Sequence, residues 1–404
     1  MHRYSERTLL LLLAAVQFTH ILDFMVIMPL GQQLMRELAI SPAGFSHLVA
    51  AYTISAGVVG FLTAPFMDRY DRRKTLLVAY AGFFLGTLAC ALSHTAGTLL
   101  ISRAICGAFG GVSGATLMAI VGDIVPPQRR ASGMGIIMAA FATAAALGVP
   151  IGLFLAQKFR WEMPFFLVAG MAVPVWVLVF VMLPPVRDHL DDSARHGFQT
   201  FFDLLRDANA GRALLFMCAL VMGHFAIIPL LAPYLVANAG LPENKLFLIY
   251  LVGGVCSAFT APMFGRLADR HGRLRVFTVL IVVASLTTLA IANSGPLPVW
   301  GTLVLAGFFF TFASGRFIPG QAIMSLAVPS RRRGSFMSLT SCARDLTSGL
   351  TSSLGGLIVT KSATGKLVNF DKLGWLAVAV SLLSLWLASR VRVNEVSHPP
   401  VKSV

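Results

Sequence analysis

Charged side chains that stand alone inside long apolar segments are the residues of this sequence best suited to chemistry. Two carboxylates and three arginines lie well inside such segments: Asp23, Asp345, Arg103, Arg316 and Arg344. If the segments are membrane helices, each charge at a helix centre costs at least ~2.5 kcal/mol on insertion scales. Because of that cost, ionisable residues at such depth mark proton relays, ion pathways or binding sites.

The first predicted pair joins Asp23 to Arg103. At ~1.5 Å per helical residue, Asp23 lies ~22 Å above the start of its segment and Arg103 lies ~28 Å above the end of its own. The long arginine side chain can cover that difference, so we predict that both face one cavity in the outer half of the membrane. Burial favours the protonated carboxyl and the arginine favours the carboxylate, so such a pair can bind and release a proton. The alternative is a fixed salt bridge that only holds two helices together.

The second predicted pair joins Arg316 to Asp345. The two residues lie on opposite sides of one short loop, and their distances from it place both near ~17 Å depth. Arg344 points about 100° away from Asp345 on a helix, so we expect it not to share that face. Arg344 can instead bind an anionic group of a substrate, or it can bond to the backbone of a broken helix.

Two histidines also belong to the predicted interior. His20 lies three residues before Asp23 and shares its helix face, and His224 occupies the related place in the seventh segment. An imidazole changes charge near neutral pH, which suits a pH-dependent step. The alternative is an interhelical hydrogen bond. We group His224 with Asp23 and Arg103 for proton coupling, and His20 with the residues of the substrate cavity or buried ion pairs.

The segments that must position these residues are long, apolar and numerous. The chain has 404 residues, of which 56% are hydrophobic and 12% charged, and its mean hydropathy is +0.78. Soluble domains carry about 25% charged residues, so lipid is the expected solvent. A membrane helix needs about 20 mainly apolar residues, and we predict an all-α membrane protein with 12 transmembrane helices. The twelve segments are 8–30, 45–67, 75–93, 98–122, 133–156, 164–183, 213–236, 246–268, 276–293, 298–324, 336–359 and 373–390.

Basic residues set the predicted orientation. Most of the 32 Lys and Arg residues fall in loops on the same side as the N-terminus, a bias that marks cytoplasmic loops. Both termini are therefore expected in the cytoplasm, below a bacterial-type inner membrane. The net charge of +15 is spread between apolar runs, which argues against a nucleic-acid partner. The five cysteines lack metal-ligand spacing, so we expect no metal and no cofactor. We also expect the protein to be a monomer.

The longest connection divides the chain into two parts. We predict an N-terminal six-helix bundle at residues 1–183, a cytoplasmic linker at 184–212 and a C-terminal six-helix bundle at 213–404. Four apolar linker residues have the i, i+3, i+4, i+7 spacing of an amphipathic helix: Phe198, Phe201, Phe202 and Leu205. This segment lies on the membrane surface in one interpretation and merely tethers the bundles in the other.

Three pairs of segments repeat in the same order along the chain. Their offsets of 201 to 203 residues indicate a parallel 6+6 duplication around a central cavity. The pairs are 64–74 with 265–275, 125–134 with 328–337, and Asp23-Phe24 with His224-Phe225.

Over nearly its whole length the chain resembles the major facilitator superfamily. Residues 265–275 fit the family's loop signature Gly-x-Leu-Ala-Asp-Arg-x-Gly-Arg closely, whereas the first copy departs at Ala64 and Asp71. The resemblance implies that these loops latch the cytoplasmic helix ends in the outward-facing state. The alternative is a pair of basic loops that only anchor topology. The predicted gating residues are Asp68, Arg69, Arg72, Gly265, Asp269, Arg270, Gly272 and Arg273.

Two further motifs carry the resemblance. Arg103 with Gly107 resembles the family's membrane-embedded arginine motif, and Gly148, Pro150 and Gly152 resemble its antiporter motif in the fifth span. The nearest grouping is the twelve-span drug:proton antiporters, including arabinose-efflux-permease-like exporters. That grouping implies alternating access, with proton-coupled export of a small organic molecule or drug across the lipid bilayer. The alternative is an uptake symporter or uniporter of a small metabolite, and no cluster of residues suggests an enzyme.

Overall fold

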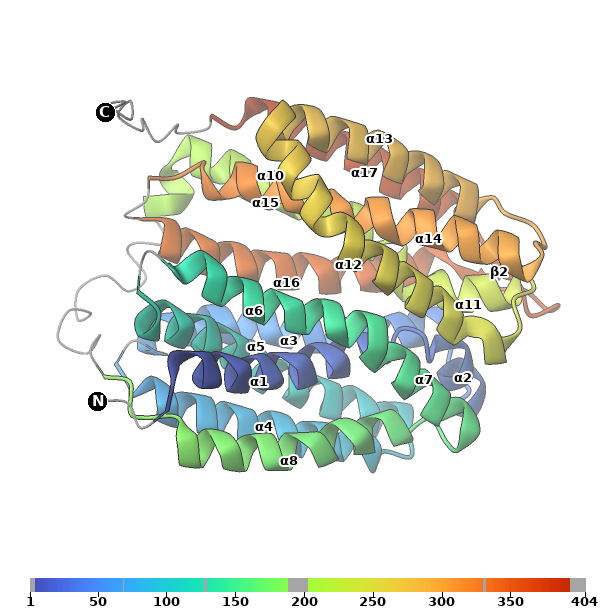
Figure 1. Ribbon diagram of the computed structural model, residues 1–404. Coiled ribbons are helices and arrows are strands. Elements are labelled where there is room, and N and C mark those ends of the chain that lie inside the picture. Colours follow the sequence, from blue (N-terminus) through green and yellow to red (C-terminus); the bar gives the residue numbers. More distant parts are fainter. Residues whose placement is uncertain (1–3, 68, 127–128, 188–202, 330–331, 393–404) are drawn as a thin grey trace.

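The computed structural model describes residues 4–67, 69–126, 129–187, 203–329 and 332–392, and long helices dominate it. Figure 1 shows the helices running side by side, with both chain termini at one end of the bundle. A two-stranded antiparallel sheet of β1 (Thr360–Lys361) and β2 (Leu367–Val368) lies at the opposite end, which we call the far end. The prediction of an all-α membrane fold is confirmed.

The N-terminal half contains the helices that hold Asp23 and Arg103. A π-helical turn, η2 (Ala144–Gly148), joins two of them. The α-helices are α1 (Glu6–Val26), α2 (Gly31–Glu37), α3 (Pro42–Met67), α4 (Arg72–Ala91), α5 (Ala96–Ile124), α6 (Arg130–Thr143), α7 (Val149–Lys158) and α8 (Met163–Met182).

The C-terminal half repeats this arrangement. It includes a short 3-10 helix, η3 (Glu243–Lys245). Its α-helices are α10 (Ala208–Phe225), α11 (Ile228–Ala237), α12 (Leu246–His271), α13 (Arg273–Ala292), α14 (Val299–Gly315), α15 (Phe317–Ser325), α16 (Arg333–Ile358) and α17 (Phe370–Arg390).

Eleven helices or helix pairs in the described residues are long and apolar enough to cross a membrane. The predicted span at 336–359 corresponds to α16, which has 26 residues but is not among those eleven. Arg344, Asp345 and many Ser, Thr and Gly residues make α16 the most polar of the long helices. Together with α16 the helices account for the twelve predicted spans.

Four of the spans are interrupted near a proline. Pro29 lies between α1 and α2, Pro150 is the second residue of α7, Pro229 is the second residue of α11 and Pro319 lies in the first turn of α15. Proline has no N–H to donate and its ring clashes with the preceding turn, so a helix cannot run through it unchanged. Neighbouring helices satisfy the freed backbone groups in a membrane protein. These breaks lie close to the charged residues described below.

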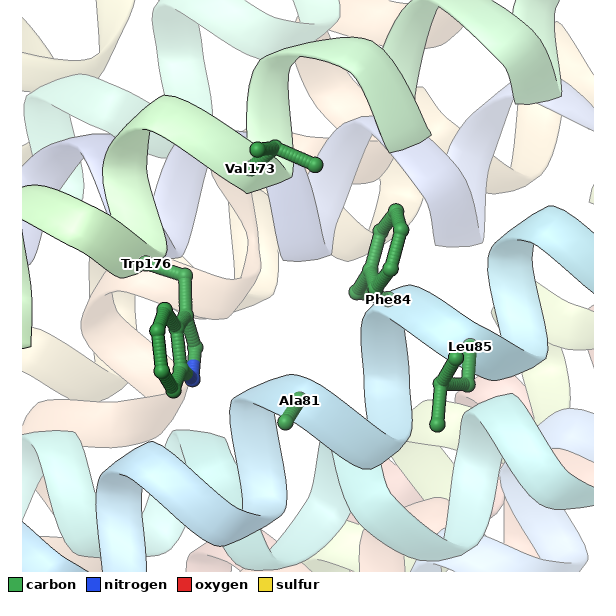
Figure 2. A pocket seen from close by; sticks show the side chains of 5 residues that line it. All are labelled: Ala81, Phe84, Leu85, Val173 and Trp176. Atoms are coloured by element: carbon green, nitrogen blue, oxygen red, sulfur yellow. The ribbon is translucent and has the colours of Figure 1, made fainter.

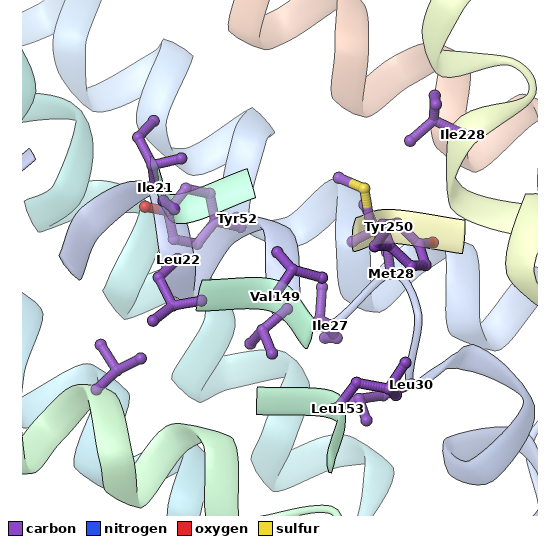
Figure 3. Packing of buried hydrophobic residues seen from close by; sticks show 14 of the residues in the cluster. Ile21, Leu22, Ile27, Met28, Leu30, Tyr52, Val149, Leu153, Ile228 and Tyr250 are labelled. Carbon is purple, nitrogen blue, oxygen red and sulfur yellow. The ribbon is translucent and has the colours of Figure 1, made fainter. Parts of the chain in front are cut away.

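The apolar core fixes the broken first span against α7. Buried Leu22 and Ile27 lie beside Val149, and Leu30 lies beside Leu153 (Figure 3). The same core cluster extends to side chains of the C-terminal half. The core therefore locates the end of α1, and Asp23 with it, close to the junction of the halves.

The two halves meet most extensively along α3 and α16. A Cβ on Gly57 would lie 2.7 Å from a side-chain atom of Leu346, and one on Gly349 would lie 2.6 Å from the Thr53 hydroxyl. Absence of side chains at these two positions lets the helices approach closely, as small residues do between membrane helices. This contact crosses the predicted domain boundary and holds the polar α16 inside the bundle.

A second junction joins α12 to the N-terminal half. This helix packs on η2 and α7, and it diverges from α6 toward the end that holds the termini (Figure 1). At the far end Arg36 pairs with Glu243 at 2.7 Å, and Gln157 donates to the backbone carbonyl of Glu243. The far end is therefore bridged by polar contacts between the halves.

The predicted linker helix lies largely outside the described residues. Phe198, Phe201 and Phe202 belong to residues 188–202, whereas Leu205 is described and exposed. Helix α8 ends at Met182 and α10 begins at Ala208. The domain boundaries and the amphipathic helix stay predictions.

Candidate functional site

Asp23 and Arg103 form a buried ion pair between α1 and α5. The Nη1 atom of Arg103 lies 2.7 Å from Oδ2 of Asp23 and also donates to the Asp23 backbone carbonyl at 3.2 Å. Thr87 of α4 donates to the other carboxylate oxygen at 3.1 Å. Both charged side chains are 0% exposed. The two predicted partners are in contact, but the pair is closed off and does not face the outer-half cavity that we predicted.

Tyr52 of α3 covers the other side of the arginine. The Arg103 guanidinium lies 4.4 Å from the centre of the Tyr52 ring, a cation–π distance. Gly107, one turn after Arg103, lies against the backbone and side chain of α3 at Tyr52 and Ser55, which brings this ring within reach. The Nε and Nη2 atoms of Arg103 and the Tyr52 hydroxyl are buried without a hydrogen-bond partner in the described residues. Such unpaired groups are costly and so point to a role other than packing.

His20 lies beside Tyr52 and is not hydrogen-bonded. Its ring centre is 6.0 Å from that of Tyr52 and 5.7 Å from that of Phe83. Neither ring nitrogen has a partner among the described residues, although both are buried. The interhelical hydrogen bond considered for His20 is therefore absent from the described structure. Gly110 and Gly114 of α5 leave room for the imidazole.

A row of rings crosses from one half of the molecule to the other. Tyr52 is 5.4 Å from Phe24, and Phe24 is 6.2 Å from Phe225 of the C-terminal half. Phe225 is 5.6 Å from His224, which is 5.2 Å from Phe317. We call these five residues the aromatic row. The repeat had marked Phe24 and Phe225 as a related pair, but the row itself was not predictable, because the chain has 30 phenylalanines and lipid-facing rings look the same in a sequence.

Arg316 lies at the far side of the aromatic row, next to Phe317. It is the residue between α14 and α15, and it is 2% exposed. Its Nη1 atom donates to Ser381 of α17 at 2.9 Å, and its Nε atom donates to the Ala313 carbonyl at 3.3 Å. The predicted Arg316–Asp345 ion pair is wrong. Equal depth does not ensure contact, because Arg316 faces α17 whereas α16 packs against α3.

Arg344 and Asp345 instead pair with each other on α16. Nε of Arg344 lies 3.3 Å from Oδ1 of Asp345, and Nη2 of Arg344 donates to Ser341 at 3.0 Å. We predicted different helix faces for these neighbours, and they nevertheless interact because the long arginine side chain bends back across the 100° between them. Helix α16 is continuous here, which excludes the broken helix considered for Arg344. The side chains are 43% and 27% exposed, so they are more accessible than the other deep charges.

A cavity of about 280 Å³ lies between α4 and α8, and none of these charged residues lines it. Figure 2 shows its lining of Ala81, Phe84, Leu85, Val173 and Trp176. The lining is apolar, and Trp176 directs its N–H to the Leu77 carbonyl at 2.9 Å. This cavity has the character of a lipid-facing groove, so the charged and aromatic centre is the candidate functional site.

Twelve membrane helices in two similar halves, with charged residues at their junction, agree with the sequence comparisons. A sequence model of the Major Facilitator Superfamily matches residues 13–263 and 213–403. The chain belongs to the Major Facilitator Superfamily. It is therefore a secondary transporter of small molecules, not an enzyme.

Relatives within the Major Facilitator Superfamily are similar along most of their length. The MFS-type transporter YceJ of Bacillus subtilis is 25% identical over 347 residues, covering 85% of this chain and 87% of that protein. The transporter named AraJ of Escherichia coli is 24% identical, with 93% of each chain covered. A solved D-xylose-proton symporter is 16% identical, with a TM-score of 0.77 over 96% of this chain and 98% of its own. That last likeness shows the shared fold.

The antiporter-like motif of the superfamily packs against α1. A Cβ on Gly148 would lie 2.9 Å from Leu22, and one on Gly152 would lie 2.7 Å from Val26. Pro150 lies at the start of α7, directly after the π-helical turn. The motif therefore holds the turn of α1 that carries Asp23.

The first superfamily loop binds the start of the predicted linker. Asp71, which departs from the family signature, accepts hydrogen bonds from Nε of Arg187 at 2.9 Å and from the backbone N–H of Val186 at 3.2 Å. It also caps α4 through the N–H of Arg73. Burial alone would raise the pKa of Asp71, but these hydrogen bonds hold it below its ordinary value. The sequence signal for this contact is the departure of Asp71 from the family signature.

The predicted gating residues of this loop have different surroundings. Arg72 pairs with Asp123 at the end of α5, at 3.1 Å. Arg69 lies over the ring of Phe66, at 5.6 Å. Asp68 lies outside the described residues. The described contacts tie α4 to α5 within one half.

The second superfamily loop is a tight turn between α12 and α13. Gly272 has a φ of 91°, in the left-handed region that favours glycine, and Arg273 starts α13. Asp269 and Arg270 lie in the last turn of α12 and are exposed, and Asp269 makes no ion pair with any described residue. Gly265 lies one turn earlier, where a Cβ would meet only Ile318 at 3.9 Å. The latch stays a prediction for these residues.

Proposed function

We propose that this superfamily member exports a small organic molecule in exchange for protons, by alternating access, with Asp23 as the proton-binding group. The observation that carries the proposal is the fully buried Asp23–Arg103 pair at the junction of the halves. Proton coupling needs a carboxyl group that can exist in both charge states. Burial favours the neutral form and Arg103 favours the charged form, so the two effects oppose each other at this carboxyl.

Protonation of Asp23 has a direct structural consequence in this proposal. The neutral carboxyl loses its ion pair, while Arg103 keeps the Asp23 backbone carbonyl and the Tyr52 ring as partners. Attraction between α1 and α5 therefore weakens when the proton binds. The next residue, Phe24, contacts Phe225 of the opposite half, so a shift of this part of α1 reaches the junction between the halves.

The setting completes the proposal. We place the protein in an inner-type membrane as a monomer, with both termini in the cytoplasm, on the bias of Lys and Arg toward that side. His224, whose Nδ1 atom is buried without a partner in the described residues, is a second group able to respond to pH. The basic loops would latch the cytoplasmic helix ends in the outward-facing state.

The test is substrate flux in proteoliposomes under an imposed pH gradient. We expect Asp23→Asn to abolish proton-driven flux while substrate exchange without a gradient continues. Asp371→Asn, at an exposed carboxyl in the first turn of α17, is the matched control and should behave like the wild type. Proton-driven flux that persists unchanged in Asp23→Asn would contradict the mechanism.

The direction of the gradient separates export from its alternatives. An exporter of this kind moves substrate against the proton flow, whereas an uptake symporter moves it with the proton flow. A uniporter gives the same flux with and without the gradient. Either of these two results would replace the proposed export.

A further inference from the structure

Arg316 carries a buried charge that no carboxylate balances in the described residues. Its hydrogen-bond acceptors are the Ser381 hydroxyl and the Ala313 carbonyl, which are both neutral. The only carboxylate predicted for it, Asp345, is bonded to Arg344. A charge within a membrane helix is costly unless it is paired. The missing negative charge must therefore come from outside the described protein residues.

The guanidinium has hydrogen-bonding capacity left for such a charge. Nη2 of Arg316 makes no hydrogen bond with the described residues, and it differs from Nη2 of Arg103 in not being sealed from solvent. Nε2 of His224 likewise makes no hydrogen bond in the described structure and is not sealed from solvent. The His224 ring lies 5.2 Å from that of Phe317, the neighbour of Arg316. Both nitrogen atoms thus belong to residues that adjoin Phe317, and we call their surroundings the Phe317 region.

The guanidinium is the source of positive charge in that region. Helix α14 ends at Gly315, directly before Arg316, and α15 starts at Phe317, directly after it. The partial charges of these two opposed helix ends offset each other. The Arg316 charge makes the region unsuitable for a cation.

The walls of the region are apolar and aromatic. Phe317 and Phe225 flank His224, and Phe225 reaches Phe24 of the other half at 6.2 Å. Rings at the junction of two halves can hold a planar or apolar molecule by stacking and burial. The site thus has a cationic end and an aromatic side.

We propose that Arg316 binds the anionic group of the transported molecule, whose apolar body packs along Phe225 and Phe317 of the aromatic row. This inference rests on the proposed function and adds to it a substrate class, that of organic anions such as aromatic carboxylates. Arg344 is not this anchor, because Asp345 already neutralises it. His224 contributes a neutral hydrogen bond to the same anionic group.

The experiment measures equilibrium binding to the full chain in lipid nanodiscs, with no pH gradient. The probes are benzoate, benzamide and benzylammonium at neutral pH, which share one ring and differ in charge. We expect benzoate to bind best to the wild type. Arg316→Gln should weaken benzoate on the order of tenfold or more and leave benzamide unchanged, because a hydrogen bond to a charged group is lost. Arg316→Lys should retain part of the preference.

Two further variants keep the test decisive. Arg344→Gln should leave the preference for benzoate intact. If this variant loses the preference, the anion site lies on α16 and the assignment to Arg316 is wrong. Ser381→Ala removes the neutral partner of Arg316 and keeps its charge, so benzoate should still be preferred. If Arg316→Gln does not fold, Arg316→Lys and Ser381→Ala still decide the outcome.

Other results would contradict the proposal directly. Equal binding of benzoate and benzamide, a preference for benzylammonium, or no binding of any probe would each exclude an organic-anion site at Arg316. A chloride-dependent stabilisation that is lost in Arg316→Gln, with no added effect of benzoate, would assign the site to a free inorganic anion instead. Because binding is measured without a gradient, these outcomes are independent of whether Asp23 couples transport to protons.

Discussion

The two halves of this transporter treat a buried arginine in opposite ways. Arg103 of the first half is sealed against Asp23, whereas Arg316 of the second half has only neutral partners among the described residues. The duplication places His224 at the position that follows Asp23 by 201 residues, so the second half has an imidazole in place of the carboxylate. Each half thus contains a buried cation, and the described residues supply a counter-charge in the first half.

The difference suggests a division of labour between the halves. A half with an internal ion pair can exchange a proton, and a half with an unbalanced cation can bind an anion. The aromatic row joins the two sites and crosses the junction at Phe24 and Phe225. Binding at either end of the row can therefore influence the packing of the halves at its centre.

The largest expected effect on stability follows the removal of Arg103, the arginine whose charge Asp23 balances. Arg103→Met leaves the Asp23 carboxylate buried without its partner, which costs about 3–5 kcal/mol of unfolding free energy. Arg316→Met strands no carboxylate in the described residues and should cost only about 1–2 kcal/mol, the value of its hydrogen bonds. Thermal unfolding of both variants in detergent measures the difference. Equal losses of unfolding free energy in the two variants would contradict the contrast between the halves. Adding Asp23→Asn to Arg103→Met removes the stranded carboxylate, so the double variant should recover much of the lost stability.

An intermediate effect is expected when the second half is made to resemble the first. His224→Asp offers Arg316 an internal carboxylate, which should compete with benzoate and weaken its binding on the order of tenfold. His224→Asn, which adds no charge, is the control and should bind benzoate nearly as well as the wild type. The binding assay in nanodiscs measures both, and undiminished benzoate binding to His224→Asp would mean that residue 224 does not reach the anion site.

The smallest effect concerns the loops, where the halves also differ. Asp71 binds Arg187 and Val186, whereas Asp269 of the second loop makes no ion pair with a described residue. Because the pKa of Asp71 is lowered on folding, its contribution to stability is complete above the ordinary carboxyl pKa of about 4. That contribution is lost as the pH falls below this value, toward the pKa of the folded state.

Asp71→Asn should therefore be less stable than the wild type at neutral pH, by under ~1 kcal/mol because Arg187 is exposed. The difference in stability between Asp71→Asn and the wild type should disappear as the sample is acidified toward pH values below about 4. Asp269→Asn is the matched control and should show no such pH-dependent gap. Thermal unfolding across a pH series measures the stability difference between each variant and the wild type. A difference for Asp71→Asn that stays constant down to acid pH would exclude the Asp71 carboxylate as its cause.

Sequence reasoning located heights in the membrane better than directions around a helix. Asp23 and Arg103 were predicted as partners because their depths agree, and α1 and α5 are indeed in contact. The same argument failed for Arg316 and Asp345, since depth contains no information on which neighbour a helix faces. The break at Arg316 turns its side chain toward α17, and only a three-dimensional structure supplies that turn.

The aromatic row was beyond sequence reasoning for a related reason. An apolar ring that faces lipid and one that faces the centre of the bundle have the same hydropathy, so composition does not separate them. Asp71 was different, because its departure from the family signature marked it without indicating what it contacts. The superfamily fold itself followed from the twelve apolar segments and the repeated loops, which depend on hydropathy and chain order alone.

The polar character of α16 also bears on how the protein enters the membrane during synthesis. Arg344 and Asp345 each add about 2.5–3.5 kcal/mol to the cost of inserting a helix at the bilayer centre, and few strongly apolar residues offset that cost. Close packing on α3, together with the hydrogen bond between His47 and Ser353, stabilises α16 in a way that lipid cannot. We therefore expect α16 to enter the membrane only after the first half is in place, so that a separately synthesised second half would lack one of its spans.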